Sequence, residues 1–478
     1  MMIQASQMLE EANRYIGQNR DKAETRYRPR FHAAPPIGWA NDPNGFFFDG
    51  KWYHLFYQHY PYEARWNDMH WGHWRSRDLV AWEDLPVAMA PDMPYDESGC
   101  FSGTALPDGE GGAHILYTGV SEKGGLQQQC YGRFDGKTIV KSASNPVIAF
   151  SLLPMGYISK DFRDPKLFRT HDGYRAVMAA KHSDGGRLVC FSSPDLKQWD
   201  YKGVFCLTDG PMPECPDVFQ LDGKTVVLYS QIPWNPKPME NRKPVLYSVG
   251  CTDPDCMRFE GGSWRRLDHG KEFYAAQTCV GANGERIAIS WMAAGEAKYP
   301  TAAIAYGWSG MMTLPRVLRL EGDRIVQTPV QGLISIRKEK MQFWAELNDN
   351  QVALTGVGAR HAEIHLWADV SRAETMTLNV MEDRNERVSL IWRDGTLVLD
   401  RAAVASHGAE QFLPEVSMPL KARQGWIDLT VYVDNCSVEV FADGEVMSAL
   451  AFPKGEAYGL SVSAKGTASA EIDCWNLA

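Results

Sequence analysis

The sequence lacks the features that would place it among membrane, secreted or zinc-binding proteins. No apolar run is long enough to span a bilayer. No basic segment followed by an apolar one opens the chain, so we expect no secretory signal. The ten cysteines include no Cys-X-X-Cys pair, which argues against a structural zinc site. We therefore expect a cytoplasmic protein with free, mostly buried thiols and no metal.

An excess of positive charge is also missing. The chain carries 49 Lys and Arg against 59 Asp and Glu, a net charge of −10. Nucleic acid and anionic membranes favour basic surfaces, so we expect neither as a partner. The 478 residues are 44% hydrophobic and 23% charged, which is ordinary for a globular protein. That length favours two or more domains.

Long helical periodicity is absent through roughly residue 320. The exception is the N-terminal extension, residues 1–29, where apolar residues at helical spacing predict a short amphipathic helix: Leu9, Ala12, Tyr15 and Ile16. From residue 30 onward, short apolar runs alternate with Asp-Gly, Asn-Gly and Gly-Gly turns, as in FFFDGKWYHLFYQ and VFQLDGKTVVLYS. Such segments predict β-hairpins with tight turns, so we expect an all-β fold.

The hairpins recur at intervals of 60, 62, 50 and 60 residues. Aligning their first strands gives the same place to Asp42, Ser102, Asp164, Glu214 and Tyr274. A second echo joins SRDLVAW (76–82), SSPDLKQW (192–199) and the looser CTDPDCMRF (251–259). Five such units predict a five-bladed β-propeller over residues 30–325. Equivalent positions on its innermost strands would converge on one axial pocket.

Strict alternation of apolar and polar residues returns in the C-terminal part. Segments such as AEIHLWADV, MTLNVME and WIDLTVYVD predict strands joined by short turns. We expect a linker with some helical character over residues 326–345 and a β-sandwich over residues 346–478.

Three of the five equivalent positions carry carboxylates. Asp42 lies in GWANDPNG, Asp164 in FRDP and Glu214 in PECPD. Cleavage of a glycosidic bond uses one carboxylic acid to protonate the leaving oxygen and a second carboxylate across the anomeric carbon. The neighbouring Arg163 could keep Asp164 ionised, and an apolar, proline-rich setting would raise the pKa of Glu214. The alternative is that these acids are turn, cap or buried structural residues.

Five motifs in order, GWANDPNG, FSG (101–103), FRDP, ECPD and EFYAAQ (272–277), resemble those of glycoside hydrolase family 32. MHWGHWRSRDLVAWEDLPVAMAPD (69–92) and CSVEVFADGEVMSAL (436–450) extend the resemblance. It implies a five-bladed propeller with a β-sandwich, retaining hydrolysis of a fructosyl bond and no cofactor. It also implies that Asp42 is the nucleophile, Asp164 a transition-state stabiliser and Glu214 the acid/base.

By position the resemblance also implies sugar contacts from eight residues: Asn41, Gln58, Trp66, Phe101, Ser102, Arg163, Tyr274 and Trp291. Trp39 and Trp308 are further candidates. The implied substrate is a small sugar, sucrose or sucrose 6-phosphate. Positive charge near the glucose side could come from any of four residues: Arg65, His70, His73 and Lys298.

The sequence leaves several alternatives open. A fructan hydrolase or a fructosyltransferase would share the same motifs. A non-catalytic carbohydrate-binding protein would use the same folds, although the intact acids argue against it. The sequence does not decide whether the protein is a homo-oligomer.

Overall fold

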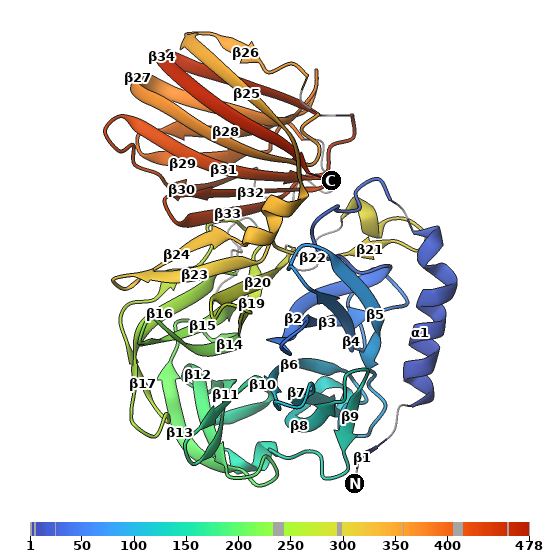
Figure 1. Ribbon diagram of the computed structural model, residues 1–478. Helices are drawn as coiled ribbons and strands as arrows, with labels where there is room; N and C mark the ends of the chain where they lie inside the picture. The colour runs from blue at the N-terminus through green and yellow to red at the C-terminus, as the bar shows by residue number, and fades with distance from the viewer. Residues whose placement is uncertain are drawn as a thin grey trace.

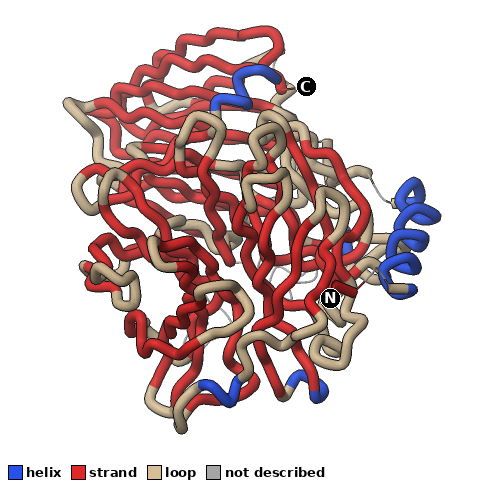
Figure 2. Tube along the Cα trace, turned by 60° about the horizontal axis from the view of Figure 1, so that its bottom comes forward, coloured by secondary structure: helices blue, strands red, loops and turns tan. Residues whose placement is uncertain are grey.

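The computed structural model describes residues 2–3, 6–23, 25–232, 243–293, 299–356, 358–404, 414–456 and 458–477. Over these ranges the chain forms a five-bladed β-propeller followed by a β-sandwich (Figure 1). Figure 2 shows that strands joined by loops and turns form both parts, with the N-terminal helix lying outside. The predicted all-β fold is therefore confirmed.

The predicted N-terminal helix is α1 (Gln7–Asn19), which packs along the edge of the first blade (Figure 1). It begins after Ser6, whose hydroxyl accepts a hydrogen bond from the Leu9 amide at 3.4 Å. Leu9, Ala12 and Ile16 are buried, as their spacing predicts, while Tyr15 is only half-buried. Within the described ranges, no helix has the length and apolar character needed to cross a membrane.

Five mainly antiparallel sheets surround the propeller axis. Blade I contains β2 (Gly38–Phe48), β3 (Tyr53–Tyr60), β4 (His70–Ser76) and β5 (Trp82–Met89), with β21 (Trp308–Ser309) parallel to β2. Blade II contains β6 (Cys100–Pro107), β7 (Ala113–Ser121), β8 (Leu126–Phe134), β9 (Ile139–Ser142) and β1 (Met2–Ile3). Blade III contains β10 (Tyr157–Thr170), β11 (Gly173–His182), β12 (Gly185–Ser193) and β13 (Asp200–Leu207).

The last two blades complete the ring. Blade IV contains β14 (Met212–Leu221), β15 (Lys224–Ile232), β16 (Val245–Thr252), β17 (Phe259–Gly261) and β18 (Arg265–Arg266). Blade V contains β19 (Tyr274–Val280), β20 (Arg286–Met292), β22 (Met311–Met312), β23 (Arg316–Glu321) and β24 (Arg324–Pro329). The first strands β2, β6, β10, β14 and β19 contact one another in a closed ring, which makes them the innermost strands.

Local turn chemistry explains the hairpins and the second sequence echo. Asp222 and Gly223, between β14 and β15, have φ of 49° and 80°, as a type I′ turn requires. The echo marks equivalent turns between the third and fourth strands of blades I and III. There Leu79 and Leu196 both have φ of 67°, and each amide donates to an upstream serine hydroxyl at 2.8 Å.

The propeller and the sandwich are joined by a short connection. Strand β24 ends at Pro329, the 3₁₀ turn η5 covers Gln331–Ile336, and β25 begins at Arg337. This connection is shorter than the expected linker of residues 326–345, whose ends belong to strands of the two domains. The other 3₁₀ turns are η1 (Arg20–Lys22), η2 (Glu122–Gly124), η3 (Phe150–Leu152) and η4 (Pro300–Ala302).

Two long strands unite the layers of the sandwich. The first half of β27 (Ala362–Glu382) pairs with β31 (Trp426–Asp434) and its second half with β28 (Val388–Arg393), while β34 (Gly459–Leu477) follows it throughout. The two strands predicted from AEIHLWADV and MTLNVME are thus one strand with bulges. The remaining strands are β25 (Arg337–Asn348), β26 (Gln351–Ala353), β29 (Thr396–Asp400), β30 (Glu415–Pro419), β32 (Ser437–Ala442) and β33 (Glu445–Leu450).

A buried network of charges joins the two domains. Arg316 on β23 contacts Asp268 at 2.8 Å and Glu439 on β32 at 2.6 Å. His32 lies between Asp434 at 2.8 Å and Glu439 at 2.9 Å. All five side chains are at most 1% exposed, so each charge depends on its partners rather than on water.

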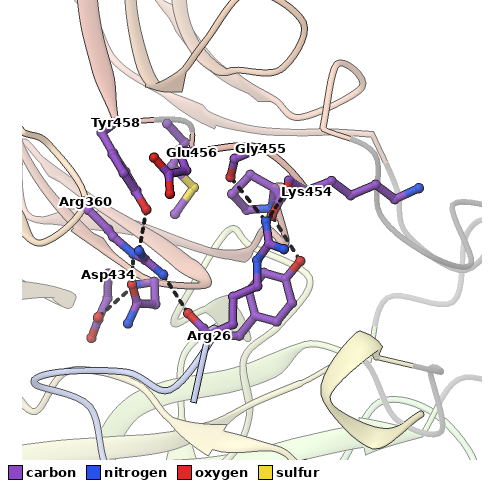
Figure 3. Close-up of a pocket in the computed structure, with 11 residues that line it drawn as sticks. Arg26, Arg360, Asp434, Lys454, Gly455, Glu456 and Tyr458 are labelled. Carbon is purple, nitrogen blue, oxygen red and sulfur yellow. Dashed lines mark hydrogen bonds between the residues drawn. The ribbon is translucent and has the colours of Figure 1, made fainter. Parts of the chain in front are cut away.

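Figure 3 shows a second junction, around a cavity of about 420 Å³ between the N-terminal segment and the sandwich. Arg360 donates to the Tyr458 hydroxyl, to the Asn435 side chain and, at 2.7 Å, to the Arg26 carbonyl. None of the predicted site residues lines this cavity.

Candidate active site

The five innermost strands bring the predicted residues together at one end of the axis. Ser102 on β6 donates to Asp42 Oδ2 on β2 at 2.9 Å, and Tyr274 on β19 donates to Glu214 Oε2 on β14. Arg163 on β10 contacts Glu214 Oε1 at 2.9 Å and Asp164 Oδ2 at 3.8 Å. The repeat therefore predicted this convergence correctly.

A β-bulge re-aims the backbone at or beside this position in every innermost strand. Register shifts follow Ala40, Phe101, Arg163, Glu214 and Tyr274 in the five strands. In three strands the bulge holds a non-glycine residue at positive φ: Asp164 at 62°, Cys215 at 47° and Ala275 at 56°. Each such residue costs about 1–3 kcal/mol, and bulges concentrate next to active sites because they turn side chains out of the regular pleat.

Asp42 is half-buried and surrounded by hydrogen-bond donors. Burial raises its pKa, and the nearby charge of Glu214 raises it further. Hydrogen bonds from Asn41, Ser102 and Cys215 oppose this by stabilising the carboxylate. The Cys215 sulfur lies 3.4 Å from Asp42 Oδ2. The pKa of Asp42 therefore lies above its ordinary value although three donors favour the carboxylate, and the side chain remains partly exposed.

Asp164 is more deeply buried. Burial raises its pKa to about 7, Arg163 opposes the shift, and the charges of Glu214 and Asp42 add to it. The Cys215 amide donates to Asp164 Oδ2 at 2.9 Å. Near neutral pH a group with this pKa is present both as the acid and as the carboxylate. The acid can donate a hydrogen bond to a hydroxyl, and the carboxylate can accept one from it.

Glu214 behaves differently from the sequence-based expectation. Burial does act to raise its pKa, but Arg163, Lys243 and Tyr274 outweigh it, so the pKa is lowered. The expected rise was wrong because the segment PECPD shows only the local apolar setting. The cations come from β10 and from the residues before β16. The free protein therefore holds this group ionised over a wider pH range than an ordinary glutamate.

One group of predicted sugar contacts surrounds Asp42 and Glu214. Asn41 is buried and accepts a hydrogen bond from Trp39 Nε1 at 2.7 Å. The Trp291 ring lies 5.9 Å from the Trp39 ring and 6.4 Å from the Tyr274 ring, edge to face in both cases. Trp39, Trp291, Trp308 and Tyr274 belong to one hydrophobic cluster. Trp291 thus bridges Trp39 and Tyr274, and Tyr274 in turn contacts Glu214.

The remaining predicted contacts lie toward blades I and II. Gln58 is buried and donates to the Cys100 carbonyl at 2.9 Å. Trp66 is 47% exposed and meets Phe101 edge to face at 5.9 Å. Exposed aromatic faces of this kind are available for stacking against a sugar ring.

The four predicted sources of positive charge have different outcomes in the structure. Burial lowers the pKa of His70 to about 4 and that of His73 well below its usual value, so both are neutral near pH 7 and the expectation of charge from them was wrong. Arg65 is exposed and paired with Glu63. Lys298 lies outside the described residues.

Sequence reasoning missed two residues at the site. Cys215 touches both Asp42 and Asp164 through its sulfur, at 3.4 and 3.7 Å. Its place next to Glu214 in ECPD could have indicated it. Lys243 Nζ lies 5.6 Å from the centre of the Tyr274 ring. No local motif marks Lys243, because only the packing of blade IV against blade V brings it there. Among the described residues, no cluster of three His, Cys, Asp or Glu could hold a metal ion.

The fold and the site together define a class of protein. A propeller whose axis ends in three mutually interacting carboxylates, lined by aromatic rings and hydrogen-bond donors, has the parts needed to cleave a glycosidic bond. These features are typical of glycoside hydrolases.

Comparison with known proteins makes the assignment specific. The sequence matches "Glycosyl hydrolases family 32 N-terminal domain" over residues 32–329 and "Glycosyl hydrolases family 32 C terminal" over residues 332–476. It is 31% identical to a sucrose-6-phosphate hydrolase of Escherichia coli over 471 residues, covering 95% of this chain and 96% of that protein. A raffinose invertase of Escherichia coli is 32% identical, covering 91% of this chain and 92% of that protein.

A solved structure agrees in fold over almost the whole length. The GH32 beta-fructofuranosidase of Bombyx mori is 28% identical and superposes with a TM-score of 0.84, covering 99% of both chains. The same silkworm protein has also been solved as a mutant in complex with sucrose. The present chain belongs to glycoside hydrolase family 32.

Proposed function

We propose that this enzyme hydrolyses the fructosyl bond of sucrose or sucrose 6-phosphate with retention of configuration. Asp42 is the nucleophile, Glu214 the acid/base and Asp164 the stabiliser of the transition state through fructosyl hydroxyls. The observation that carries the proposal is the meeting of these carboxylates from three different blades: the charge of Glu214 acts on both Asp42 and Asp164. Relatives that bear sucrose-6-phosphate hydrolase and invertase names support the substrate class.

The reaction takes two steps. Glu214 protonates the bridging oxygen while Asp42 attacks C2 of the fructosyl unit and forms a covalent intermediate. Glu214 then removes a proton from water, which attacks the same carbon and restores the carboxylate of Asp42. Ser102 and Cys215 stabilise the carboxylate form of Asp42 before attack and after release.

The test is the variant Asp42→Asn, which keeps the size of the side chain and removes the nucleophile. We expect no measurable fructose release and an unchanged thermal unfolding midpoint. Ser121→Ala, a hydroxyl change at the end of β7 rather than on an innermost strand, is the matched control and should keep full activity. Near-normal turnover by the folded Asp42→Asn protein would refute the assignment.

The choice between sucrose and its phosphate depends on charge near the leaving group. Lys243 is exposed, its ammonium lies 5.6 Å from the centre of the Tyr274 ring, and its charge acts on Glu214, the proposed acid/base. We propose that it meets a phosphate there. The values of kcat/KM for sucrose and sucrose 6-phosphate, measured side by side, should favour the phosphate. Lys243→Met should remove most of that preference. Because Lys243 also helps to lower the pKa of Glu214, the quantity to compare is the ratio of the two kcat/KM values in each protein rather than the absolute rate on sucrose. Equal kcat/KM values for the two substrates in the wild-type protein would favour plain sucrose, and an unchanged phosphate preference in Lys243→Met would remove Lys243 from this role.

Two alternatives have their own tests. A fructan hydrolase would release fructose from inulin or levan as readily as from sucrose, and a levanase of Bacillus subtilis is 32% identical over 92% of this chain and 68% of that protein. A fructosyltransferase would yield glucose in excess over free fructose. The cytoplasmic location stays a prediction.

A further inference from the structure

The chain segment that leads into β19 is docked on the sandwich. The Ser448 amide of β33 donates to Asp268 Oδ1 at 3.1 Å, and the His269 amide donates to the Val446 carbonyl at 2.9 Å. Gly270 passes so close that an added Cβ would lie 1.9 Å from the Ser448 carbonyl oxygen. These hydrogen bonds and this close approach hold the backbone of residues 268–270 in a fixed position against the sandwich.

The docking ends in a buried ion pair. Glu272 is 0% exposed, and both of its oxygens meet the guanidinium of Arg401, which follows β29 of the sandwich, at 2.9 and 3.1 Å. Arg401 Nη1 also donates to the Leu450 carbonyl at 2.5 Å. A two-pronged pair fixes orientation as well as distance, and its burial makes either charge costly without the other.

Tyr274 follows Glu272 by two residues, which places their Cα atoms within about 7 Å of each other. Tyr274 opens β19, and its hydroxyl donates to Glu214. On the other side its carbonyl accepts from Ser290 Oγ at 2.6 Å. Leu450 and Phe452 of the sandwich belong to the same hydrophobic cluster as Tyr274. The backbone of Tyr274 is thus held between blade V and the sandwich.

We propose that Arg401 is a positioning residue for the acid/base: by holding Glu272 from the sandwich, it fixes the Tyr274 hydroxyl against Glu214. This inference rests on the proposed function. The C-terminal domain would then contribute to catalysis by positioning Tyr274, although Arg401 itself does not contact the carboxylates of the site. A hydrogen bond weakens steeply with distance and angle, so a small shift of the backbone at Tyr274 is enough to lose its contact with Glu214.

The expected signature is a change in pH dependence. Glu214 is faced by Arg163 from β10, by Tyr274 from β19 and by Lys243 from the segment before β16. The carboxylates of Asp42 on β2 and Asp164 on β10 face it as well. Of these, only Tyr274 is reached through Arg401. Since the tyrosine hydroxyl stabilises the ionised form, losing it lets Glu214 keep its proton to higher pH.

The experiment measures the pH profile of kcat/KM on sucrose for Arg401→Met, Glu272→Gln and the double variant, which removes both buried charges together. We expect a loss of about tenfold at the optimum and a shift of the alkaline limb to higher pH. Tyr274→Phe should shift it in the same direction. Arg401→Met added to Tyr274→Phe should move the limb no further, and Arg401→Lys should restore part of the loss.

The matched control is Leu399→Ala. Leu399 is 1% exposed on β29 beside Arg401, so its truncation weakens the sandwich without touching Glu272. In Leu399→Ala the alkaline limb of the pH profile of kcat/KM should stay where it is in the wild-type protein. An unmoved limb in the folded Arg401→Met and double variants, or additive shifts with Tyr274→Phe, would overturn this inference. If the wild-type protein released no fructose from sucrose or sucrose 6-phosphate, the proposed function itself would fail instead.

Discussion

His32 gives the sharpest prediction about stability, because it is a buried cation between two carboxylates at the domain junction. Burial lowers its pKa, but hydrogen bonds and charges of Asp434 and Glu439 dominate and raise the pKa from 6.5 to about 9. Because the pKa of His32 is higher in the folded protein than in the unfolded chain, proton binding adds about 3 kcal/mol to the free energy of unfolding. The stability is fully present below pH 6.5 and is lost as the pH rises through about 9. The lowered pKa values of the two carboxylates describe the same contacts and are not added.

The perturbation is His32→Gln, which keeps hydrogen-bonding capacity and removes the charge. We expect urea unfolding to show a difference in free energy between wild type and variant that shrinks by about 3 kcal/mol from about pH 6 to pH 9.5. Taking the difference cancels titrations that both proteins share. The control is His171→Gln, the same substitution at an exposed histidine, which measures the effect of replacing a histidine by glutamine away from the domain junction.

A constant difference between wild type and His32→Gln across this range would refute the reasoning. It would mean that His32 is neutral in the folded protein, and that Asp434 and Glu439 are satisfied by their backbone donors and by Arg316 alone.

Three further predictions concern the site and the domain contact. Glu214→Gln should lower kcat/KM far more on sucrose than on an aryl fructoside with a good leaving group, since only the leaving oxygen of sucrose needs to be protonated. Equal losses on the two substrates would remove Glu214 from the acid role. Cys215→Ala removes a hydrogen bond that lowers the pKa of Asp42. The acidic limb of kcat/KM should therefore move to higher pH, whereas Cys215→Ser, which keeps a donor, should leave it nearly in place. Gly270→Ala should lower the thermal midpoint, because its Cβ would strike the Ser448 carbonyl at 1.9 Å. Gly262→Ala, where the nearest atom is 3.8 Å away, should change the midpoint little.

Much of this architecture follows from the sequence alone. The Asp222-Gly223 turn and the helix spacing of Leu9, Ala12 and Ile16 are local, because backbone preference and burial pattern depend on neighbours along the chain. The repeat extends that local information across the propeller. Once equivalent strands are recognised, symmetry about an axis brings Asp42 and Glu214 together without any knowledge of their contacts.

Tertiary structure alone decided the electrostatics and the links between domains. The pKa of Glu214 is lowered because Arg163 and Lys243 reach it from other segments, and the apolar sequence around it predicts the opposite. The pair of Glu272 and Arg401 spans 129 residues, and no spacing or motif announces it. Charge interactions depend on distances through space, which a sequence does not contain. Turns, caps and strand patterns depend on adjacent residues, which it does.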